Sequence, residues 1–362
     1  MTKRIVVCCD GTWNTPDQGA DGRATPTNVT KVAAAVAESD PAGMDQLVYY
    51  QPGVGTTPWE RIRGGAFGFG LSRGVQQVYR FIVNNYEPGD ELFLFGFSRG
   101  AYLARSTGGL IRNASILRRE NVDQVGAAYD LYRSRTIRPR DVESALFRRS
   151  FSHPEPRIRF IGVWDTVGAL GIPWSGIPAI DRLNRPWEFH DTRLSSRVDS
   201  AFHALAVDEA RKPFEPALWQ QSPTASDQQL EQVWFRGVHC DVGGGYAETG
   251  LSDIALGWLA QRAQENGLAF VDGAFTEAGP GTEESHPGPG TFEPDPFGVL
   301  HDSRTGLYRF LPPAPRVIGA EPRGQEFVSS SALERSAGDP ASMPANLRAG
   351  VDGGIDVMDV QP

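Results

Sequence analysis

The chain has 362 residues, of which 40% are hydrophobic and 22% are charged, and these values are typical of a globular protein with a packed core. The formal net charge of −9 argues against broad nucleic-acid binding, in which clustered Lys and Arg supply the affinity. Cys8, Cys9 and Cys240 indicate no disulfide framework, because two of them are adjacent in sequence. We interpret them as reduced thiols of a cytoplasmic protein.

The chain begins with a short apolar run at residues 4–9, which predicts a strand buried on both faces. This run is too short for a secretory signal peptide, and no apolar run in the sequence approaches the length of a membrane span. We therefore expect a cytoplasmic protein whose export would need a signal-independent secretion system. A helix over about residues 28–38 and a second strand at residues 46–50 are predicted next.

A clear apolar stripe at helical spacing predicts a helix over residues 75–86, and the strand at 91–95 is followed by a helix to about residue 111. The first 112 residues therefore alternate strand and helix three times. Such alternation predicts an α/β fold with a mostly parallel central sheet flanked by helices. The G-x-S-x-G turn that follows the third strand makes this fold α/β-hydrolase-like. Ligands of these sheets bind beyond the carboxyl ends of the strands.

Farther along the chain, we predict strands at residues 157–164 and 232–238 and helices over residues 199–211 and 253–265. Each of these two strands is followed at once by a residue that could do acid or base chemistry. Asp165 follows the first strand, and His239 follows the second. The strands therefore place both residues at the edge of the sheet where ligands are expected.

The predicted catalytic domain covers residues 1–271 and carries two insertions. The insertion at 113–157 is polar and helical, whereas the one at 168–197 is rich in Pro and Trp and is a candidate lid over an acyl pocket. Residues 272–362 form a Pro- and Gly-rich C-terminal extension, which we expect to pack partly on the core. Within it, residues 308–311 are predicted as one more strand.

The pattern G-x-S-x-G occurs twice, around Ser72 and around Ser98. A nucleophile elbow needs a strand, a sharp turn with small neighbours, and then a helix. Ser98 meets this requirement, because it follows a strand, is flanked by Gly96 and Gly100, and precedes a helix rich in small residues. Ser72 has no strand before it and is interpreted as a helix cap. The sequence therefore predicts Ser98 as a nucleophile.

A serine hydroxyl needs an imidazole to take its proton and a carboxylate to orient that imidazole. In α/β-hydrolases these groups occur in the chain order Ser, Asp or Glu, His. We predict His239 as the base and Asp165 as the orienting acid. Asp241 lies too close to His239 in sequence to reach its ring and is predicted to support the turn, whereas His203 is interpreted as a residue of a helix face.

A tetrahedral intermediate needs two donors aimed at its oxyanion. The amide of Arg99, directly after the nucleophile, is the first candidate, and the amide of Gly11 or Thr12 in the loop after the first strand is the second. Asp10 is predicted to brace this loop by accepting backbone hydrogen bonds. A phosphatase is disfavoured, because its nucleophilic Asp would stand where this chain has Cys8.

We expect no metal and no cofactor, because no Cys and His spacing suggests zinc and Ser-His-Asp chemistry requires neither. A cation held by Asp10, Asp165 and Asp241 is a weaker alternative. The glycine-rich stretch at residues 64–74 lacks the preceding strand that a dinucleotide site requires.

Five sequence blocks, in this order, resemble the catalytic domain of type VI secretion phospholipase effectors, over about residues 4–260. They are CDGTWN (9–14), GFSRGA (96–101), GVWDTVGALG (162–171), HALAVDEAR (203–211) and GVHCDVGGGY (237–246).

The resemblance implies a Ser-Asp-His hydrolase fold and assigns Ser98, Asp165 and His239, which agrees with the reading of the residues. It further implies hydrolysis of lipid or phospholipid acyl esters. We expect transient contact to a membrane surface and, from the net charge, no nucleic-acid partner. Two alternatives stay open, a small-molecule esterase or thioesterase and a non-catalytic binding module on the same scaffold. The sequence does not decide whether the protein is a secreted toxin or a housekeeping enzyme, and it does not give the oligomeric state.

Overall fold

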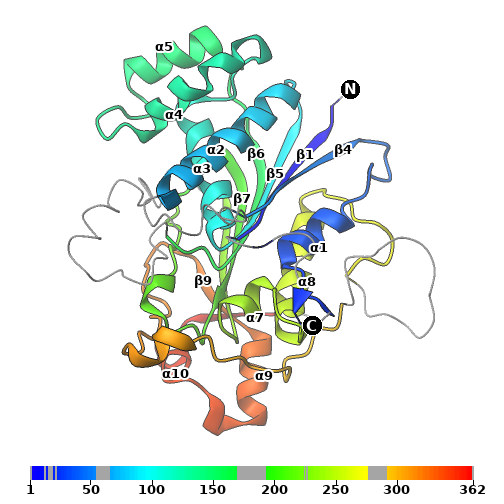
Figure 1. The fold of residues 1–362 in the computed structure, drawn as a ribbon, viewed down its shortest axis with the longest axis vertical. Coiled ribbons are helices and arrows are strands. Elements are labelled where there is room, and N and C mark those ends of the chain that lie inside the picture. The colour runs from blue at the N-terminus through cyan, green and yellow to red at the C-terminus, as the bar shows by residue number, and fades with distance from the viewer. Residues whose placement is uncertain are drawn as a thin grey trace.

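A twisted sheet between two layers of helices forms the centre of the computed structural model, which is shown in Figure 1. The structure describes residues 2–11, 14, 19–20, 23–53, 66–168, 193–223, 225, 227–275 and 292–360.

The main sheet of the described residues has eight strands, and every neighbouring pair is parallel. Because the strands are parallel, all their carboxyl ends lie at one edge of the sheet. In spatial order the strands are β10 (Asp356–Met358), β9 (Glu326–Ser329), β8 (Gln229–Phe235), β7 (Val198–Ala206), β6 (Ile158–Trp164), β5 (Glu91–Phe97), β1 (Arg4–Cys9) and β4 (Gln46–Gln51). The predicted α/β class and the parallel sheet are confirmed.

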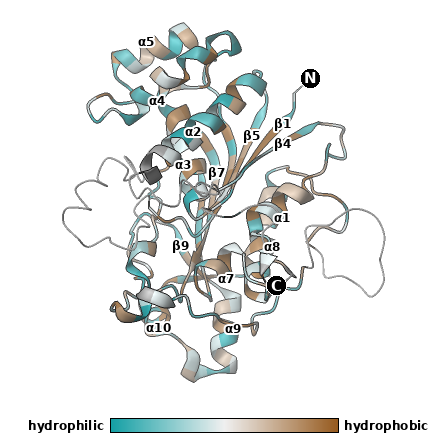
Figure 2. Cartoon of the chain, viewed as in Figure 1, coloured by the Kyte–Doolittle hydropathy of each residue, from teal (hydrophilic) through white to brown (hydrophobic). Residues whose placement is uncertain are grey.

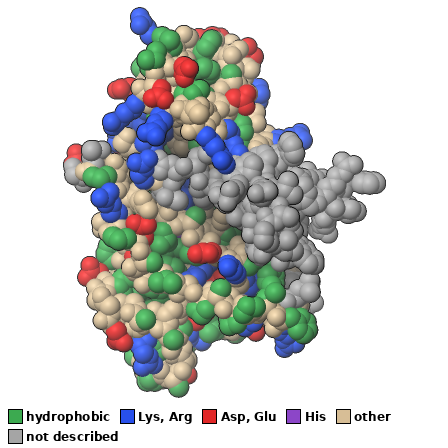
Figure 3. Space-filling model, turned by 90° about the vertical axis from the view of Figure 1, so that its left-hand side faces the viewer, with side chains coloured by type: hydrophobic (Ala, Val, Ile, Leu, Met, Phe, Trp, Pro, Cys, Tyr) green, Lys and Arg blue, Asp and Glu red, His purple; other side chains and the backbone are tan. Residues whose placement is uncertain are grey.

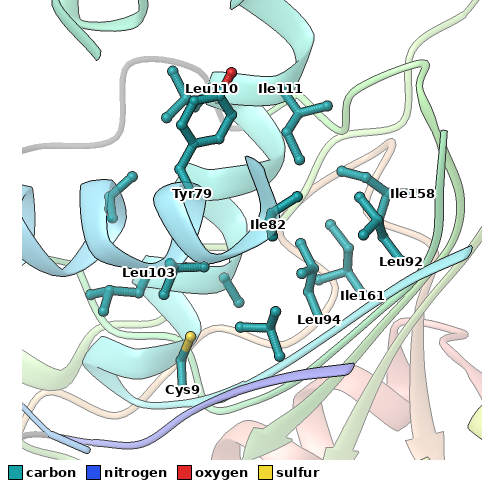
Figure 4. Close-up of a cluster of buried hydrophobic side chains, with 14 of the residues drawn as sticks. Cys9, Tyr79, Ile82, Leu92, Leu94, Leu103, Leu110, Ile111, Ile158 and Ile161 are labelled. Carbon is teal, nitrogen blue, oxygen red and sulfur yellow. The ribbon is translucent and has the colours of Figure 1, made fainter. Parts of the chain in front are cut away.

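The central strands are buried on both faces, as the apolar run of β1 illustrates. Alternate residues of a strand point to opposite faces, so Ile5 and Val7 join one apolar cluster and Val6 joins the other. Figure 4 shows the first cluster, where Ile82 lies toward Leu94 of the sheet and Tyr79 lies beside Leu110 of a neighbouring helix. The helices on this first face are α2 (Ala66–Asn85), α3 (Arg99–Ala114) and α4 (Val125–Arg133), and those on the second face are α1 (Asn28–Ala35) and α8 (Gly250–Glu265).

The insertion predicted at residues 113–157 carries helix α5 (Val142–Phe151) after α4, and Phe147 and Phe151 of α5 pack against the first cluster. Figure 2 shows hydrophilic and hydrophobic residues mixed along α5, whereas the central strands are mainly hydrophobic. A short pair of antiparallel strands, β2 (Gly19–Ala20) and β3 (Arg23–Ala24), forms a separate small sheet. None of the helices within the described ranges is both long and apolar enough to cross a bilayer.

The C-terminal region continues the main sheet. Strand β9 pairs with β8, and β10 pairs with β9, so this region completes one edge of the sheet. Helices α9 (Ser330–Gly338) and α10 (Ala345–Asp352) pack beside them, and Val328 and Leu347 join Trp234 in a third apolar cluster. Residues 292–360 of the predicted extension therefore pack against the sheet and share this apolar cluster with it.

Two predicted elements are wrong. Residues 199–211 were expected to be helical, but β7 occupies most of this range, because a central position with both faces buried overrides the helix preference of its alanines. Residues 308–311 were expected to form a strand, but Gly306–Phe310 is a 3-10 helix, and the strand that pairs with β8 comes about 20 residues later, at β9.

Candidate active site

Ser98 occupies a sharp turn between β5 and α3. Its backbone has φ 58° and ψ −119°, a conformation that costs energy for a residue with a Cβ atom, and its N–H donates to the carbonyl of Trp164 at 3.0 Å. The flanking glycines make this turn feasible. A Cβ on Gly100 would lie 2.0 Å from the carbonyl oxygen of Cys9, and one on Gly96 would lie 2.6 Å from the carbonyl oxygen of Gly100. The turn has the geometry of a nucleophile elbow.

The structure brings the three predicted side chains into one hydrogen-bonded chain. Ser98 Oγ lies 2.8 Å from His239 Nε2, and His239 Nδ1 lies 2.5 Å from Asp165 Oδ2. All three residues are buried, with exposed fractions of 4% for Ser98, 4% for His239 and 0% for Asp165. An imidazole held between a hydroxyl and a carboxylate can take a proton from the hydroxyl.

Asp165 is positioned by the end of β6 and by the neighbouring strand β7. Its backbone lies in the left-handed region with φ 40°, its N–H donates to the carbonyl of Ala204 at 2.7 Å, and its Oδ1 accepts the N–H of Ala206 at 3.0 Å. His203 positions Thr166, the residue after Asp165, because His203 Nε2 accepts the N–H of Thr166 at 3.0 Å. His203 lies on β7 and not on a helix face as predicted, and burial lowers its pKa to about 3, so it is a neutral acceptor.

Sequence reasoning missed Arg316, which binds the carboxylate of Asp165 with two nitrogens. Arg316 Nη1 lies 2.5 Å from Asp165 Oδ1, and Nη2 lies 2.9 Å from Oδ2. The guanidinium is buried and also donates to the carbonyls of Ala206 and Phe214. No local pattern marks Arg316 in the sequence, because it stands in a Pro-rich segment that only the tertiary structure brings to the site.

These contacts set the charges of the site. Burial raises the pKa of the Asp165 carboxyl, but the Arg316 charge and the His239 hydrogen bond outweigh burial and hold that pKa well below its usual range. Burial lowers the pKa of His239, and this effect outweighs the opposing effect of Asp165. At neutral pH the site therefore holds an ionised carboxylate and a neutral imidazole, which are the states that a general base requires.

Aromatic rings enclose the imidazole of His239, which is the first residue of the short helix α7 (His239–Gly243). The ring of Phe97 lies 4.6 Å away between centroids, and the ring of Phe214 meets the imidazole edge-on at 4.9 Å. Glu209 accepts the backbone N–H of His239 at 3.3 Å and forms a bidentate ion pair with Arg211. These contacts fix the backbone and the ring plane of the imidazole.

Asp241 does not contact the ring of His239 through any hydrogen bond among the described residues. Its carboxylate accepts the N–H of Val238 at 3.0 Å and binds His301 Nδ1 at 2.6 Å. Asp241 therefore caps α7 and ties this helix to the C-terminal region, which agrees with the role in the turn expected from the sequence.

The loop after β1 borders Ser98. A Cβ on Gly11 would lie 3.3 Å from Ser98 Cβ, so this loop and the nucleophile elbow are adjacent. Asp10 Oδ1 accepts the N–H of Gly11 at 2.6 Å, and its Oδ2 accepts the hydroxyls of Thr27 and Tyr50. The amide of Gly11 is thus bound to Asp10 in this structure. Thr12 lies outside the described residues.

Arg99 is the first residue of α3, so its amide lies in the first turn of that helix, directly after Ser98. The predicted lid at residues 168–197 lies mostly outside the described residues. No group of three or more His, Cys, Asp or Glu within the described ranges could hold a metal ion.

The second G-x-S-x-G copy lies inside α2. Ser72 is a helical residue whose hydroxyl accepts a hydrogen bond from Tyr129 at 2.8 Å, and it is neither at an elbow nor at a helix cap. A Cβ on Gly74 would lie 2.7 Å from the side chain of Leu103, so this glycine allows α2 to pack closely on α3. The repeated pattern therefore reflects helix packing at this position.

Comparisons with known proteins point to one family. The family model described as T6SS phospholipase effector Tle1-like, catalytic domain, matches residues 3–262. An uncharacterized protein of Saccharomyces cerevisiae is 28% identical over 244 residues, which cover 61% of this chain and 33% of the yeast protein. This chain therefore spans about a third of the length of that curated relative.

Two solved structures are similar to this one. The crystal structure of an uncharacterized protein from Pseudomonas aeruginosa has 18% identity and a TM-score of 0.47, covering 74% of this chain and 47% of that chain. The structure of the Tle1 effector bound to the VgrG spike from the type VI secretion system has 19% identity and a TM-score of 0.38, covering 69% of this chain and 52% of that chain. Because the family model matches well over half of its residues, this chain belongs to the family of Tle1-like T6SS phospholipase effector catalytic domains.

Proposed function

We propose that this chain is a serine hydrolase that cleaves acyl esters of lipids, with Ser98 as nucleophile, His239 as general base and Asp165 as orienting acid. The hydrogen-bonded chain from Ser98 Oγ through His239 to Asp165, built on a strained elbow, is the observation that carries the proposal. Membership of a phospholipase effector family supports a phospholipid as the substrate class.

In the first half of the reaction, Ser98 Oγ attacks the ester carbonyl carbon while His239 Nε2 takes the hydroxyl proton. Asp165 keeps Nδ1 protonated and stabilises the imidazolium that forms. The tetrahedral intermediate then collapses, the bond from carbon to the alcohol oxygen breaks, and His239 returns the proton to the leaving alcohol. The acyl group remains on Ser98 as an ester.

In the second half, water attacks the acyl-enzyme, His239 takes a proton from that water, and Ser98 leaves with the proton that His239 returns. The developing oxyanion needs two N–H donors in both halves. We assign one to Arg99, at the start of α3, where the helix dipole also favours negative charge. The second N–H donor stays a prediction for the loop of Gly11 and Thr12. In this structure the Gly11 amide donates to Asp10, so Gly11 would have to exchange that hydrogen bond for one to the oxyanion.

The proposal is tested by comparing Ser98→Ala with Ser72→Ala, because both serines stand in the same five-residue pattern. We expect the wild-type protein to react with a fluorophosphonate probe and to release fatty acid from phospholipid vesicles. Ser98→Ala should abolish labelling and lower kcat by at least about a thousandfold, since the nucleophile is removed. Ser72→Ala should retain both, because Ser72 lies inside α2.

Three results would count against parts of the proposal. If the wild-type protein takes up no probe, the chain is a non-catalytic module. If Ser72→Ala loses labelling and Ser98→Ala keeps it, the nucleophile is misassigned. If p-nitrophenyl butyrate is hydrolysed but vesicles are not, the substrate is a small ester or thioester and not a membrane lipid.

A further inference from the structure

The side-chain amide of Asn14 lies beside the nucleophile, in the loop after β1. A Cβ atom built on Gly11 would lie 2.8 Å from Asn14 Nδ2 and 3.3 Å from Ser98 Cβ. Gly11 carries no such atom, so its Cα hydrogen faces the space between the amide and the elbow. An oxyanion hole needs an N–H donor about 2.7–3.1 Å from the oxygen that it stabilises. A substrate oxygen that enters this space therefore comes within hydrogen-bonding range of Asn14 Nδ2.

The position of Asn14 is fixed by backbone and side-chain hydrogen bonds. Its N–H donates to the carbonyl of Gly11 at 3.1 Å, and its carbonyl accepts the N–H of Gly53 at 3.2 Å. Asn14 Nδ2 donates to Asp10 Oδ1 at 3.3 Å. Because a carboxylate only accepts hydrogen bonds, this contact requires that the amide nitrogen, and not the amide oxygen, faces Asp10. The donor end of the side chain is thus the end that lies near the elbow.

Asp10 is itself held by hydroxyl groups from two other elements. Its Oδ2 accepts hydrogen bonds from Thr27 at 2.7 Å and Thr30 at 3.1 Å, at the start of α1, and from Tyr50 of β4 at 2.6 Å. Asp10 is buried, so these bonds are shielded from water. Asp10 therefore ties the amide of Asn14 to the sheet and to α1. Such fixed positioning suits an oxyanion donor, because a preorganised donor need not reorient during the reaction.

The two candidate donors of this loop differ in how closely Asp10 holds them. The N–H of Gly11 donates to Asp10 Oδ1 at 2.6 Å, whereas Asn14 Nδ2 lies 3.3 Å from the same oxygen. The Gly11 amide has one hydrogen, and this short contact uses it. The Asn14 amide has two hydrogens, and among the described residues Asp10 is the one acceptor of Nδ2. Asn14 can thus donate to a substrate oxygen and still keep its bond to Asp10.

We propose that Asn14 Nδ2 is the second donor of the oxyanion hole, together with the N–H of Arg99. This inference rests on the proposed serine-hydrolase function. When Ser98 Oγ bonds to the ester carbon, the π electrons of the carbonyl move onto its oxygen, and the two donors each give that oxygen one hydrogen bond. When the alcohol leaves, the carbon–oxygen double bond forms again, and Asn14 keeps both of its protons. Asn14 is a catalytic residue in this scheme, because its amide contacts the reacting oxygen.

The test compares Asn14→Ala with Asn85→Ala as a matched control. Asn85 is the last residue of α2, at the end that leads into the amino end of β5, so it lies at the opposite edge of the sheet from Ser98. Like Asn14 it is half-buried, and its Nδ2 donates to the carbonyl of Phe81 at 2.8 Å. The control therefore removes a similar amide and one hydrogen bond without touching the candidate active site.

A soluble ester, p-nitrophenyl butyrate, is the substrate. Figure 3 shows hydrophobic side chains interspersed with acidic and basic ones among the described residues of one face, and a soluble ester makes the measured rate independent of how such a surface meets a vesicle. We expect Asn14→Ala to lower kcat about 100- to 1,000-fold, the usual effect of removing one oxyanion donor, with KM changed less than about threefold. Asn85→Ala should keep both constants within about twofold of the wild-type values.

An inhibitor that mimics the intermediate separates lost stabilisation from a distorted loop. An alkyl trifluoromethyl ketone is attacked by Ser98 and then carries the oxyanion, whereas the corresponding trifluoromethyl alcohol has the same size and cannot be attacked. In Asn14→Ala the Ki of the ketone should rise by about the factor by which kcat/KM falls, and the Ki of the alcohol should stay within about twofold. Because Ki does not depend on the amount of folded enzyme, partial unfolding does not obscure this comparison.

The outcomes distinguish the two proposals. The assignment of Asn14 is overturned if Asn14→Ala hydrolyses the ester at the wild-type rate, or if the ketone and the alcohol lose affinity equally. If such a variant is active while the wild-type protein is labelled at Ser98, the hydrolase function stands and the oxyanion assignment alone fails. If the wild-type protein hydrolyses no ester and takes up no fluorophosphonate probe, the proposed function fails, and the assignment of Asn14 fails with it.

Discussion

The carboxylate of Asp165 is bound on one side by the imidazole that it orients and on the other by the guanidinium of Arg316. Together with the N–H of Ala206, these donors engage both carboxylate oxygens in a site where Asp165 has no exposed surface. If Arg316 were removed, the buried carboxylate of Asp165 would still be charged, but it would lack the guanidinium that binds both of its oxygens. Removal of one partner from a buried ion pair typically costs about 3–5 kcal/mol of folding stability.

We predict that Arg316→Gln shifts the pH profile of ester hydrolysis. Activity should rise with pH as His239 loses its proton, with a midpoint below the value of about 6.5 for a free imidazole, because burial lowers its pKa. Loss of the positive charge at residue 316 favours the imidazolium, so the midpoint should move to higher pH. We expect kcat/KM at neutral pH to fall about 10- to 100-fold, less than the roughly 10⁴-fold reported for loss of an orienting carboxylate.

The Arg316→Lys variant is the control, since it keeps the charge and loses the planar fork. Its midpoint should stay near that of the wild-type protein, although its kcat should be reduced by poorer orientation of Asp165. Glu209 and Arg211, the other charged groups near His239, are unchanged in both variants. A Gln variant with the wild-type pH profile would show that Arg316 serves stability alone.

At the scale of elements, the turn from β5 into α3 depends on glycines that allow close backbone contact. A Cβ on Gly100 would meet two backbone oxygens, that of Cys9 at 2.0 Å and that of Asp10 at 2.6 Å. Backbone atoms of a central strand cannot move aside as a flexible side chain can. The same close approach places α3 against the first strand of the sheet and lifts Ser98 above the sheet edge.

We predict that Gly100→Ala displaces α3 and destabilises the protein by about 1–3 kcal/mol or more, with loss of fluorophosphonate labelling. Urea unfolding and labelling measure the two effects. Gly126→Ala in α4 is the control, because nothing lies within 4 Å of its added Cβ, and alanine there should raise stability by up to about 1 kcal/mol. Equal labelling of both variants would contradict the role assigned to Gly100.

Strand β7 is an element whose type the sequence pattern did not predict correctly. Strand β7 has the sequence VDSAFHALA, whose alanines favour a helix in isolation, and both its faces are covered by other elements. A continuous apolar run of this length does not distinguish a buried strand from a buried helix. Strand β6 was predictable, because Ile158, Phe160, Ile161 and Val163 have strong strand preferences and Asp165 ends the run.

At the scale of the whole molecule, the C-terminal region shares the main sheet with the residues that the family model matches. It supplies β9, β10 and Arg316, which lie beyond residue 262, and its Val328 and Leu347 pack with Trp234 in the third apolar cluster. A boundary at residue 271 therefore separates strands of one sheet, and it separates Arg316 from Asp165 of the candidate active site.

We predict that a chain ending at residue 271 is neither stably folded nor active. Truncation exposes Trp234 and the unpaired edge of β8, and each large buried side chain exposed costs about 1.5–3 kcal/mol. Circular dichroism during heating and fluorophosphonate labelling are the measurements. The full-length Arg316→Gln variant, which keeps both strands, should still unfold cooperatively. A truncated chain that folds and hydrolyses esters at the wild-type rate would disprove this prediction.

The sequence alone determined the α/β class, the strands β1, β4 and β5 with their helices, and the candidate nucleophile Ser98, base His239 and acid Asp165. These follow from local rules, since apolar periodicity sets each element and a strand end places a side chain at one known edge. Only the tertiary structure decided the contacts of Arg316 with Asp165 and the pairing of β9 and β10 with the rest of the sheet. Neither is encoded by spacing along the chain, because long-range packing alone brings those segments together.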